Sequence, residues 1–358
     1  MKLRPTTPYS LPPPPSLLLL LVLLAVLLAG CAAPPTKPVG EYFWPPKPET
    51  PRIKWLTQWS NRYDFGAPNP IISFFIGEER TETLRRPTSV VADSAGSIYV
   101  ADGEQGLVFV FDQEKKALRF LGEGILAGPV GVAMDNKRGI VFVSDSRLDK
   151  IFGIDKNTGN LLMSIGAPKE FSNPSGMVYD EESERLYVSD TQNHAIRVFD
   201  RDGKLLLKFG SRGFEDGEFN FPSYLALDAK GRLFVVDTLN FRVQIFDREG
   251  KFINKFGKLG DASGTFTRPY GVGVDSEGHV YVVDSAFNNF QIFEENGGVF
   301  LLNIGNAGRK PGEFYLPQGM YIDKQDRIYI ADTLNHRVQV FQYLKEQGAG
   351  NQETGSKE

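Results

Sequence analysis

The side chains best suited to chemistry in this chain are one cysteine, three histidines and a set of repeated aspartates. Cys31 is the only cysteine among the 358 residues, so no disulfide can form within the chain. It follows Leu28-Ala29-Gly30, at the end of a twelve-residue apolar run that starts at Leu17. A charged start, a short apolar run and small residues before a cut site are typical of an export signal.

The stretch Leu28 to Cys31 resembles a bacterial lipobox, in which the chain is cut before the cysteine and the thiol carries lipid. The resemblance implies cleavage between Gly30 and Cys31 and membrane attachment through lipid on Cys31. Several acyl chains hold a protein stably, whereas one holds it marginally. We expect export and lipid anchoring in a bacterial cell envelope, facing periplasm or surface; the outer membrane is favoured because Ala32 is not the aspartate of inner-membrane lipoproteins. The alternative is an uncleaved anchor, because the apolar stretch reaches about 17 residues.

Six aspartates recur every 43 to 48 residues, each after a run rich in Val, Ile, Phe and Tyr and before Ser, Thr or Gly. A ring of carboxylates could bind calcium. Their position favours another role, because an aspartate that ends a strand accepts backbone N–H bonds in the following turn. We therefore predict structural turn caps at Asp102, Asp145, Asp190, Asp237, Asp284 and Asp332.

These aspartates belong to a larger repeat that offers four short strands per copy. A fixed period in this range indicates a propeller or a solenoid. Four antiparallel strands bury both faces only by stacking on neighbours, and a closed ring removes most exposed edges. We predict an all-β fold, a six-bladed β-propeller of four-stranded antiparallel blades, with repeats at about 87–122, 129–166, 174–210, 222–257, 269–305 and 317–341.

The sixth repeat supplies only three strands, so an N-terminal strand must close the ring. Ile53 to Trp59 alternates better than Ile71 to Gly77, which is then left as a short helix or packed loop. The predicted organisation is a signal peptide at 1–30, a Pro-rich linker at 31–51, the propeller at 52–345 and a disordered polar tail at 346–358. The aromatic patch Tyr42-Phe43-Trp44 in the linker either docks on the domain or the membrane, or is linker filler.

Three repeats carry the motif Asp-Thr-x-Asn followed by an Arg and a strand that ends in Phe. The copies are Asp190 to Phe199, Asp237 to Phe246 and Asp332 to Phe341, and they resemble the NHL family of β-propellers. Repeats 1 and 2 depart from the pattern, so their loops are expected to differ. We expect the arginines to pair with such aspartates between blades, at Arg197, Arg242 and Arg337.

Charge argues against nucleic acid as a partner. Some NHL propellers of animals bind RNA, which needs a concentrated basic face to neutralise phosphates. This chain has 40 Lys and Arg against 44 Asp and Glu, and loss of Lys2 and Arg4 with the signal makes it more acidic.

The loops between strands 2 and 3 of each blade share one face with the connections from strand 4 to the next strand 1. On this face the repeats differ most at one position, and variable tips on a repeated scaffold usually carry binding. The candidate binding residues are His194, Phe241, Phe287 or its neighbour Asn288, and His336. Phe241 and Phe287 could form an apolar patch for a protein or peptide, or could cover gaps between blades.

The histidines are the candidates for a catalytic site, because the resemblance implies six-bladed relatives such as a zinc-dependent peptidylglycine amide lyase with an Asp-x-x-x-His loop. His194 and His336 match that loop but lie on opposite blades, too far apart for one zinc with ligands at about 2.0 to 2.1 Å. His279 follows a turn on the other face. The sequence therefore favours a membrane-tethered, non-catalytic scaffold that binds a protein, peptide or glycan, without a catalytic or metal site and without calcium or zinc as cofactor. The alternative is a metal-dependent lyase or hydrolase acting on an envelope substrate.

Overall fold

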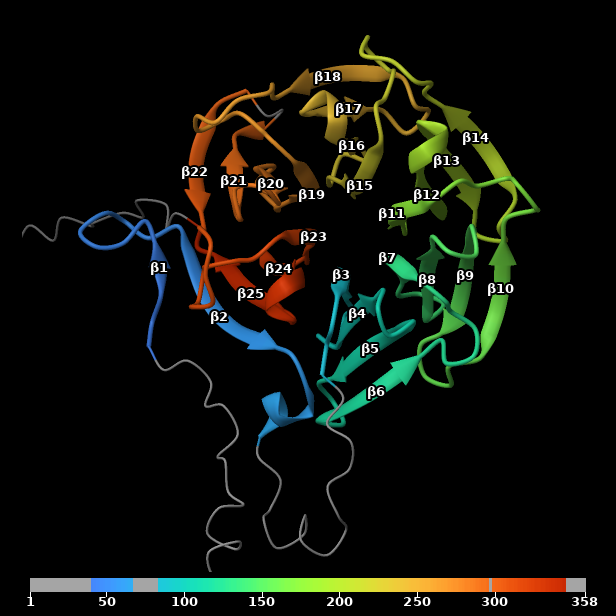
Figure 1. Cartoon of the computed structure of the whole chain (residues 1–358), viewed down its shortest axis with the longest axis horizontal. Coiled ribbons are helices and arrows are strands. Elements are labelled where there is room, and N and C mark those ends of the chain that lie inside the picture. Colours follow the sequence, from blue (N-terminus) through green and yellow to red (C-terminus); the bar gives the residue numbers. More distant parts are fainter. Residues whose placement is uncertain (1–39, 67–82, 296–297, 346–358) are drawn as a thin grey trace, which may run out of the picture. The chain divides into compact units, whose positions relative to one another are not determined.

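The computed structural model describes residues 40–66, 83–295 and 298–345. These residues form six antiparallel sheets that stand as blades around one axis (Figure 1). The helical segments among them are single 3-10 turns, and none of the described helices is long and apolar enough to cross a bilayer. The predicted six-bladed, all-β fold is therefore confirmed.

Each blade runs outward from the axis in chain order, and its strands are called strands 1 to 4 in that order. The strands are β3 (Pro87–Ala92), β4 (Ile98–Asp102), β5 (Leu107–Asp112) and β6 (Ala117–Leu121) in blade 1; β7 (Pro129–Asp135), β8 (Ile140–Asp145), β9 (Lys150–Asp155) and β10 (Leu161–Ile165) in blade 2; β11 (Pro174–Asp180), β12 (Arg185–Asp190), β13 (Ala195–Asp200) and β14 (Leu205–Phe209) in blade 3; β15 (Pro222–Leu227), β16 (Leu233–Asp237), β17 (Arg242–Phe246) and β18 (Phe252–Phe256) in blade 4; β19 (Pro269–Val274), β20 (Val280–Asp284), β21 (Asn289–Phe293) and β22 (Phe300–Ile304) in blade 5; and β23 (Pro317–Ile322), β24 (Arg327–Asp332) and β25 (Arg337–Tyr343) in blade 6.

The same strand register recurs in every blade. The proline that begins strand 1 lies opposite the aspartate that ends strand 2, as in Pro222 and Asp237, and a register shift follows at once. Proline has no N–H to donate, so the first residue of a strand accommodates it. The sequence repeat therefore reflects the same pairing of strands 1 and 2 in every blade.

The hydrophobic core lies between neighbouring blades. Phe234 and Val243 of blade 4, for example, share one cluster with Val272 and Val280 of blade 5. Each blade therefore depends on its neighbours for burial of both faces, as expected of a closed ring.

An N-terminal strand completes blade 6. Strand β2 (Ile53–Trp59) pairs antiparallel with β25 as its fourth strand. Trp55 of β2 is 5% exposed, and its Nε1 donates to Oε1 of Gln339 at 3.1 Å. The predicted closure is confirmed, with the segment that its alternation favoured; the other candidate, Ile71 to Gly77, lies outside the described residues.

The aromatic patch of the predicted linker docks on the domain. Phe43 and Trp44 form β1 (Phe43–Trp44), a fifth strand on the outside of β2. Tyr42 lies edge-on to Trp55, and Trp44 lies edge-on to Phe341, both with ring centroids 5.8 Å apart. The folded part of the chain therefore begins before the predicted boundary at residue 52. Cys31 and the signal peptide lie outside the described residues.

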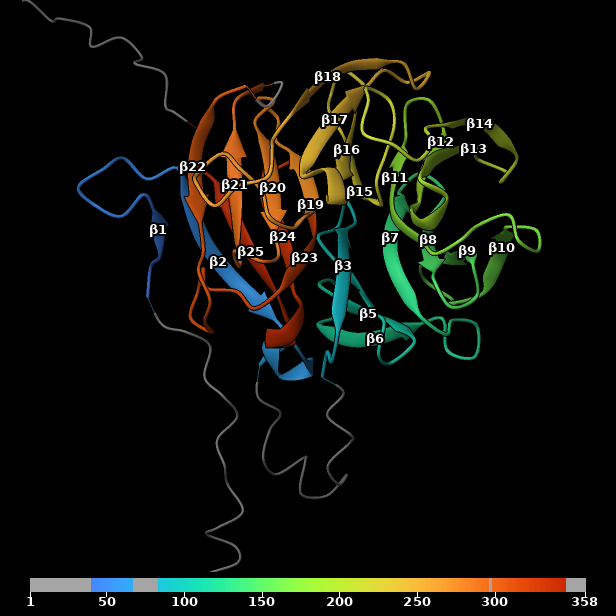
Figure 2. The ribbon, with the colours of Figure 1, turned by 45° about the horizontal axis from the view of Figure 1, so that its top comes forward.

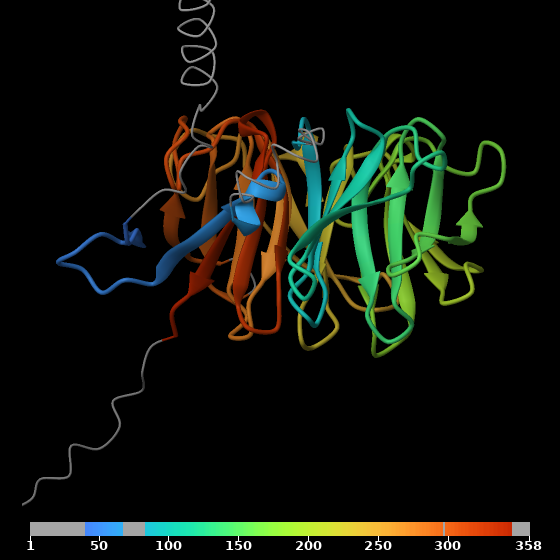
Figure 3. The same ribbon diagram turned by 90° about the horizontal axis from the view of Figure 1, so that it is seen from below.

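The ring has two faces, which Figure 2 shows obliquely and Figure 3 from the edge. The loop face carries the loops between strands 2 and 3 and the connections to the next blade. The hairpin face carries the turns between strands 1 and 2 and between strands 3 and 4. Within blade 4, the N–H of Leu239 in the 2–3 loop donates to the carbonyl of Asn220 in the incoming connection, at 3.0 Å.

Candidate functional site

The six repeated aspartates are fully buried, and their oxygens accept bonds within their own blade. Oδ1 of Asp102 accepts the N–H groups of Glu104 and Gln105 in the following turn, and Oδ2 accepts those of Arg85 and Arg86 in the incoming connection. These bonds occupy the oxygen lone pairs that a calcium ion would need. The other five aspartates bind the incoming connection in the same way: Asp145, Asp190, Asp237, Asp284 and Asp332.

The expectation that the repeated arginines pair between blades is wrong. Nε of Arg242 donates to Oδ2 of Asp237 in the same blade at 2.8 Å, because the two residues lie opposite each other in the register of β16 and β17. The remaining nitrogens of Arg242 donate to the carbonyls of Phe214, Glu215 and Glu218 at 2.8 to 3.0 Å. The arginine thus fastens the incoming connection to its own blade. Arg197 and Arg337 do the same with Asp190 and Asp332.

In three blades the residue after the aspartate bonds the next blade, a contact that was not predicted from the sequence. Oγ1 of Thr191 donates to the carbonyl of Pro222, at the start of the next blade, at 2.8 Å. Thr333 makes the same bond to the carbonyl of Pro87 at 2.8 Å and so joins blade 6 to blade 1. The Ser or Thr that follows five of the six aspartates was the signal that could have revealed it.

The predicted binding residues of the loop face occupy one repeated backbone position. His194, Phe241, Asn288 and His336 all have positive φ, between 52° and 58°. Phe287 lies one residue earlier, where the motif has Asn240, so Asn288 is the equivalent of the other three. Non-glycine residues take this left-handed conformation at a cost, and such strained positions persist only where the surroundings fix them.

The side chains at this position reach the next blade. Nδ1 of His194 accepts the N–H of Phe221 at 3.2 Å, and its ring lies edge-on to the Phe221 ring at 4.8 Å. Oδ1 of Asn288 accepts the N–H of Leu316 at 2.8 Å, and His336 bonds the carbonyl of Arg85.

Phe241 and the ring of His194 also serve packing within the propeller. Phe241 packs on the core between blades 4 and 5. Burial lowers the pKa of His194, which favours its neutral form. Among the described residues, no three His, Cys, Asp or Glu side chains are close enough to hold one metal ion. The structure therefore gives these loop tips contacts that join blades, and it does not bring Phe241 and Phe287 into one cluster.

The axis of the ring contains two cavities with Tyr224 between them. One cavity of about 270 Å³ opens on the loop face, and one of about 450 Å³ opens on the hairpin face. Tyr224 extends from β15 across the axis, and its hydroxyl donates to the carbonyl of Thr88, in the opposite blade, at 2.6 Å. The side chain is 4% exposed.

Tyr224 fits because the inner strands of the other blades carry only glycine or serine at the equivalent position. The second residue after the first proline of the blade is a glycine in four blades and Ser89 in blade 1. A Cβ at Gly319 would lie 2.6 Å from the carbonyl oxygen of Thr88, so the backbones approach too closely for a side chain there. The ring has room for one large residue at this level. The four glycines are Gly131, Gly176, Gly271 and Gly319.

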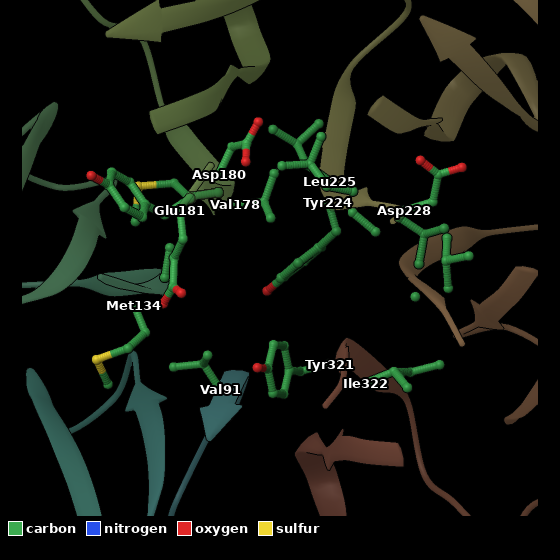
Figure 4. Close-up of a pocket in the computed structure, with 18 of the residues that line it drawn as sticks. Val91, Met134, Val178, Asp180, Glu181, Tyr224, Leu225, Asp228, Tyr321 and Ile322 are labelled. Carbon is green, nitrogen blue, oxygen red and sulfur yellow. The ribbon is translucent and has the colours of Figure 1, made fainter. Parts of the chain in front are cut away.

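The larger cavity, called the axial pocket from here on, is the best candidate site. The inner strands of all six blades line it, and most of its lining residues from these strands are apolar. Three of the five methionines of the chain, Met134, Met177 and Met320, contribute to this wall. Figure 4 shows the hydroxyl groups of Tyr224 and Tyr321 pointing into the space between the blades.

The mouth of the axial pocket is charged, with more acidic than basic side chains. Asp180, Glu181, Glu182 and Asp228 line it together with Arg248 and Lys324. Oε1 of Glu181 accepts the N–H of Asn136 at 3.1 Å, and Oδ2 of Asp180 lies 3.2 Å from Nε of Arg248. Burial raises the pKa of Tyr321, and the nearby carboxylates of Asp323 and Glu181 raise it further. The pocket thus combines an apolar interior with a negative potential.

Ligand binding was predicted on the opposite face, because the loop tips vary most between repeats. The axial pocket is instead formed by inner-strand residues that the ring brings together from six repeats. The consecutive acids Glu181 and Glu182 after Asp180 were one sequence signal of this pocket, since the equivalent turn of blade 4 has Ala229 and Lys230.

Comparisons with known families agree with this fold. The NHL repeat family matches residues 171–199 and 314–341, and a family described as a 6-bladed beta-propeller matches residues 224–286. Human NHL repeat-containing protein 2 is 31% identical over 146 residues, which is 32% of this chain and 20% of that protein. The chain thus matches about a fifth of the length of this relative.

Two solved structures show the same fold at low sequence identity. A protein of unknown function from Bacteroides thetaiotaomicron superposes with a TM-score of 0.59 at 15% identity, covering 74% of this chain and 70% of that one. Virginiamycin B lyase from Staphylococcus aureus superposes with a TM-score of 0.54 at 14% identity, covering 72% of this chain and 95% of the lyase. At these identities the likeness concerns the fold alone.

Proposed function

We propose that this chain, an NHL-repeat six-bladed β-propeller, is a lipid-tethered binding module of a bacterial cell envelope. It binds a protein, peptide or glycan and carries out no chemical step. The observation that supports this most is the composition of the axial pocket. Its described lining residues include neither histidine nor cysteine, and apolar side chains of the inner strands line it together with charged groups at its mouth. Such a pocket suits burial of apolar ligand surface.

The tether is proposed from the sequence, because Cys31 lies outside the described residues. The apolar run, Gly30 and the single cysteine support cleavage and lipidation. Expression of the full chain and of Cys31→Ser in a bacterium, with an alkyne-tagged fatty acid in the medium, tests this. We expect label and membrane fractionation for the natural chain; the variant should carry no label and should be either released from membranes or left uncut. A variant that still fractionates with membranes and is cut at the same site would disprove lipidation.

The binding role is tested separately in intact cells. A photo-crosslinking residue is placed on the loop face at Phe241 or in the axial pocket at Tyr321, and adducts are purified from solubilised membranes. We expect one discrete adduct from at least one of the two positions. Absence of a reproducible adduct from both positions under several growth conditions would count against a binding module.

Elemental analysis separates the binding module from the metal-dependent alternative. The purified full chain is expected to contain calcium and zinc well below one ion per molecule. A metal present at one ion per molecule, and lost together with a measurable lyase or hydrolase activity, would favour the enzyme.

A further inference from the structure

We infer that the axial pocket binds a peptide segment that inserts one apolar side chain and places a lysine or arginine at the pocket mouth. This inference rests on the proposed binding function and names the class of its ligand. It also assigns the ligand to the hairpin face and not to the loop face.

The interior of the axial pocket selects for an apolar group. Val91, Val178, Leu225 and Ile322 line it from four blades (Figure 4), and they also pack on the cores between the blades. Its volume of about 450 Å³ falls in the usual range of ligand pockets, roughly 300 to 1,000 Å³. The three methionines add a polarisable lining that adapts to inserted groups. Burial of a large apolar side chain is worth about 1.5 to 3 kcal/mol.

The polar groups inside are too few for a sugar. The hydroxyl of Tyr224 is already bonded to the carbonyl of Thr88. The Tyr321 hydroxyl points into the pocket, where it can donate to a ligand carbonyl. A buried sugar would leave most of its hydroxyl groups unpaired, at about 1 to 3 kcal/mol each.

The mouth selects for a positive charge. Four carboxylates line it. Arg248 pairs with Asp180 and Glu182, Arg232 pairs with Asp228, and Lys324 lies 3.9 Å from Glu181, so the four carboxylates outnumber their three cationic partners. The cavity on the loop face has the opposite character, because its charged lining residues are Arg86 and Arg147. A peptide with lysine or arginine beside its apolar residue therefore complements the hairpin face and is disfavoured on the loop face.

A matched set of labelled peptides tests the ligand class. The probe is fluorescein-Gly-Ser-Lys-Trp-Lys-Ser-Gly-amide, titrated with the purified full chain and followed by fluorescence anisotropy. Replacement of its Trp by Ser, or of both Lys by Glu, is expected to weaken binding at least about tenfold. Equal binding of the three peptides, or no binding of the first, would overturn the inference.

Variants of the protein locate the site. Glu181→Lys is expected to weaken binding of the Lys-Trp-Lys peptide at least about tenfold and to improve binding of the Glu-Trp-Glu peptide. Glu123→Lys makes the same change in charge at an exposed residue of the β6–β7 connection and should leave both affinities unchanged. Circular dichroism and urea unfolding establish that both variants are folded. Equal effects of the two variants would assign the preference to net charge and refute the site.

Crosslinking in cells distinguishes failure of this inference from failure of the binding function. An adduct from Tyr321 that the Lys-Trp-Lys peptide suppresses, and the Glu-Trp-Glu peptide does not, supports the inference. An adduct from Phe241 alone would retain a binding module but would move its ligand to the loop face, which rejects the inference.

Discussion

At the scale of single residues, the repeated Asp-Thr-x-Asn motif divides its work among its positions. The aspartate caps the turn and holds the incoming connection, and the threonine bonds the next blade. The side chain of Asn193 donates to Asp190, and His194 takes the left-handed position after it. Sequence reasoning identified the caps from the position of each aspartate at a strand end. It could not assign the threonine and the tip residue, because their partners belong to the next repeat.

The pair of Arg242 and Asp237 gives a prediction about stability. Arg242→Met leaves the buried carboxylate of Asp237 without its cation and frees the carbonyls of Phe214 and Glu215. Removal of one partner of a buried pair costs about 3 to 5 kcal/mol. We expect a loss of this size in the free energy of unfolding measured with urea. Arg212→Met, at an exposed arginine of the same connection, should change it by less than about 0.5 kcal/mol.

Two histidines predict opposite effects of pH on stability. A hydrogen bond to Asp275 raises the pKa of His279, so its contribution is complete below about pH 6.5 and is lost as pH rises through the folded-state pKa. Burial lowers the pKa of His194, so its contribution is present above about pH 6.5 and is lost as pH falls through the folded-state pKa.

Urea unfolding between pH 5 and pH 9 measures these contributions. Relative to the natural chain, His279→Gln should lose less stability between pH 6.5 and pH 9, and His194→Gln should lose less between pH 6.5 and pH 5. Unchanged pH profiles in both variants would show that neither pKa shift contributes to stability.

At the scale of elements, β2 is the strand on which the ring depends. It comes from the other end of the sequence and supplies Ile53, Trp55 and Trp59 to clusters that involve blades 5, 6 and 1. The alternation of apolar and polar residues was enough to predict β2 as the closing strand. Strand β1 could not be predicted, because a proline-rich segment with three aromatic residues is equally compatible with a linker.

Trp55→Ala tests the closure. Truncation of a buried tryptophan costs about 3 to 5 kcal/mol, and Gln339 loses a donor in the process. We expect that loss in urea unfolding, with faster amide exchange in β25 than in the strands of blades 2 and 3. Leu56→Ala, at an exposed neighbour on the same strand, is the control and should change stability by less than about 0.5 kcal/mol. Similar effects of the two substitutions would mean that β2 does not hold the ring closed.

At the scale of the whole molecule, the number of blades and their strand order were predictable, because one period recurs six times in the sequence. The axial pocket was not, since it exists only when six inner strands meet. Tyr224 had a visible signal, as the one bulky residue at a position that is otherwise glycine or serine. Its contact with Thr88 across the axis requires the closed ring.

Tyr224→Phe measures that contact. The substitution keeps the ring of the side chain and removes the hydroxyl that bonds Thr88, at a cost of about 1 to 3 kcal/mol for the unpaired carbonyl. Tyr270→Phe is the matched control, because no protein group bonds the Tyr270 hydroxyl among the described residues; it should be nearly neutral. Equal stability of the two variants would show that the bond across the axis contributes nothing.

The pairing of β2 with β25 also sets when the protein can fold. Trp55 and Gln339 are separated by 284 positions in the chain, so β2 leaves the ribosome among the first strands and its partner among the last. Contacts between such distant residues form late, because loop closure must come before them. If the chain is exported as proposed, the ring closes only after the final strand has crossed the membrane. Until then β2 lacks its partner and offers an open edge at which other chains could pair.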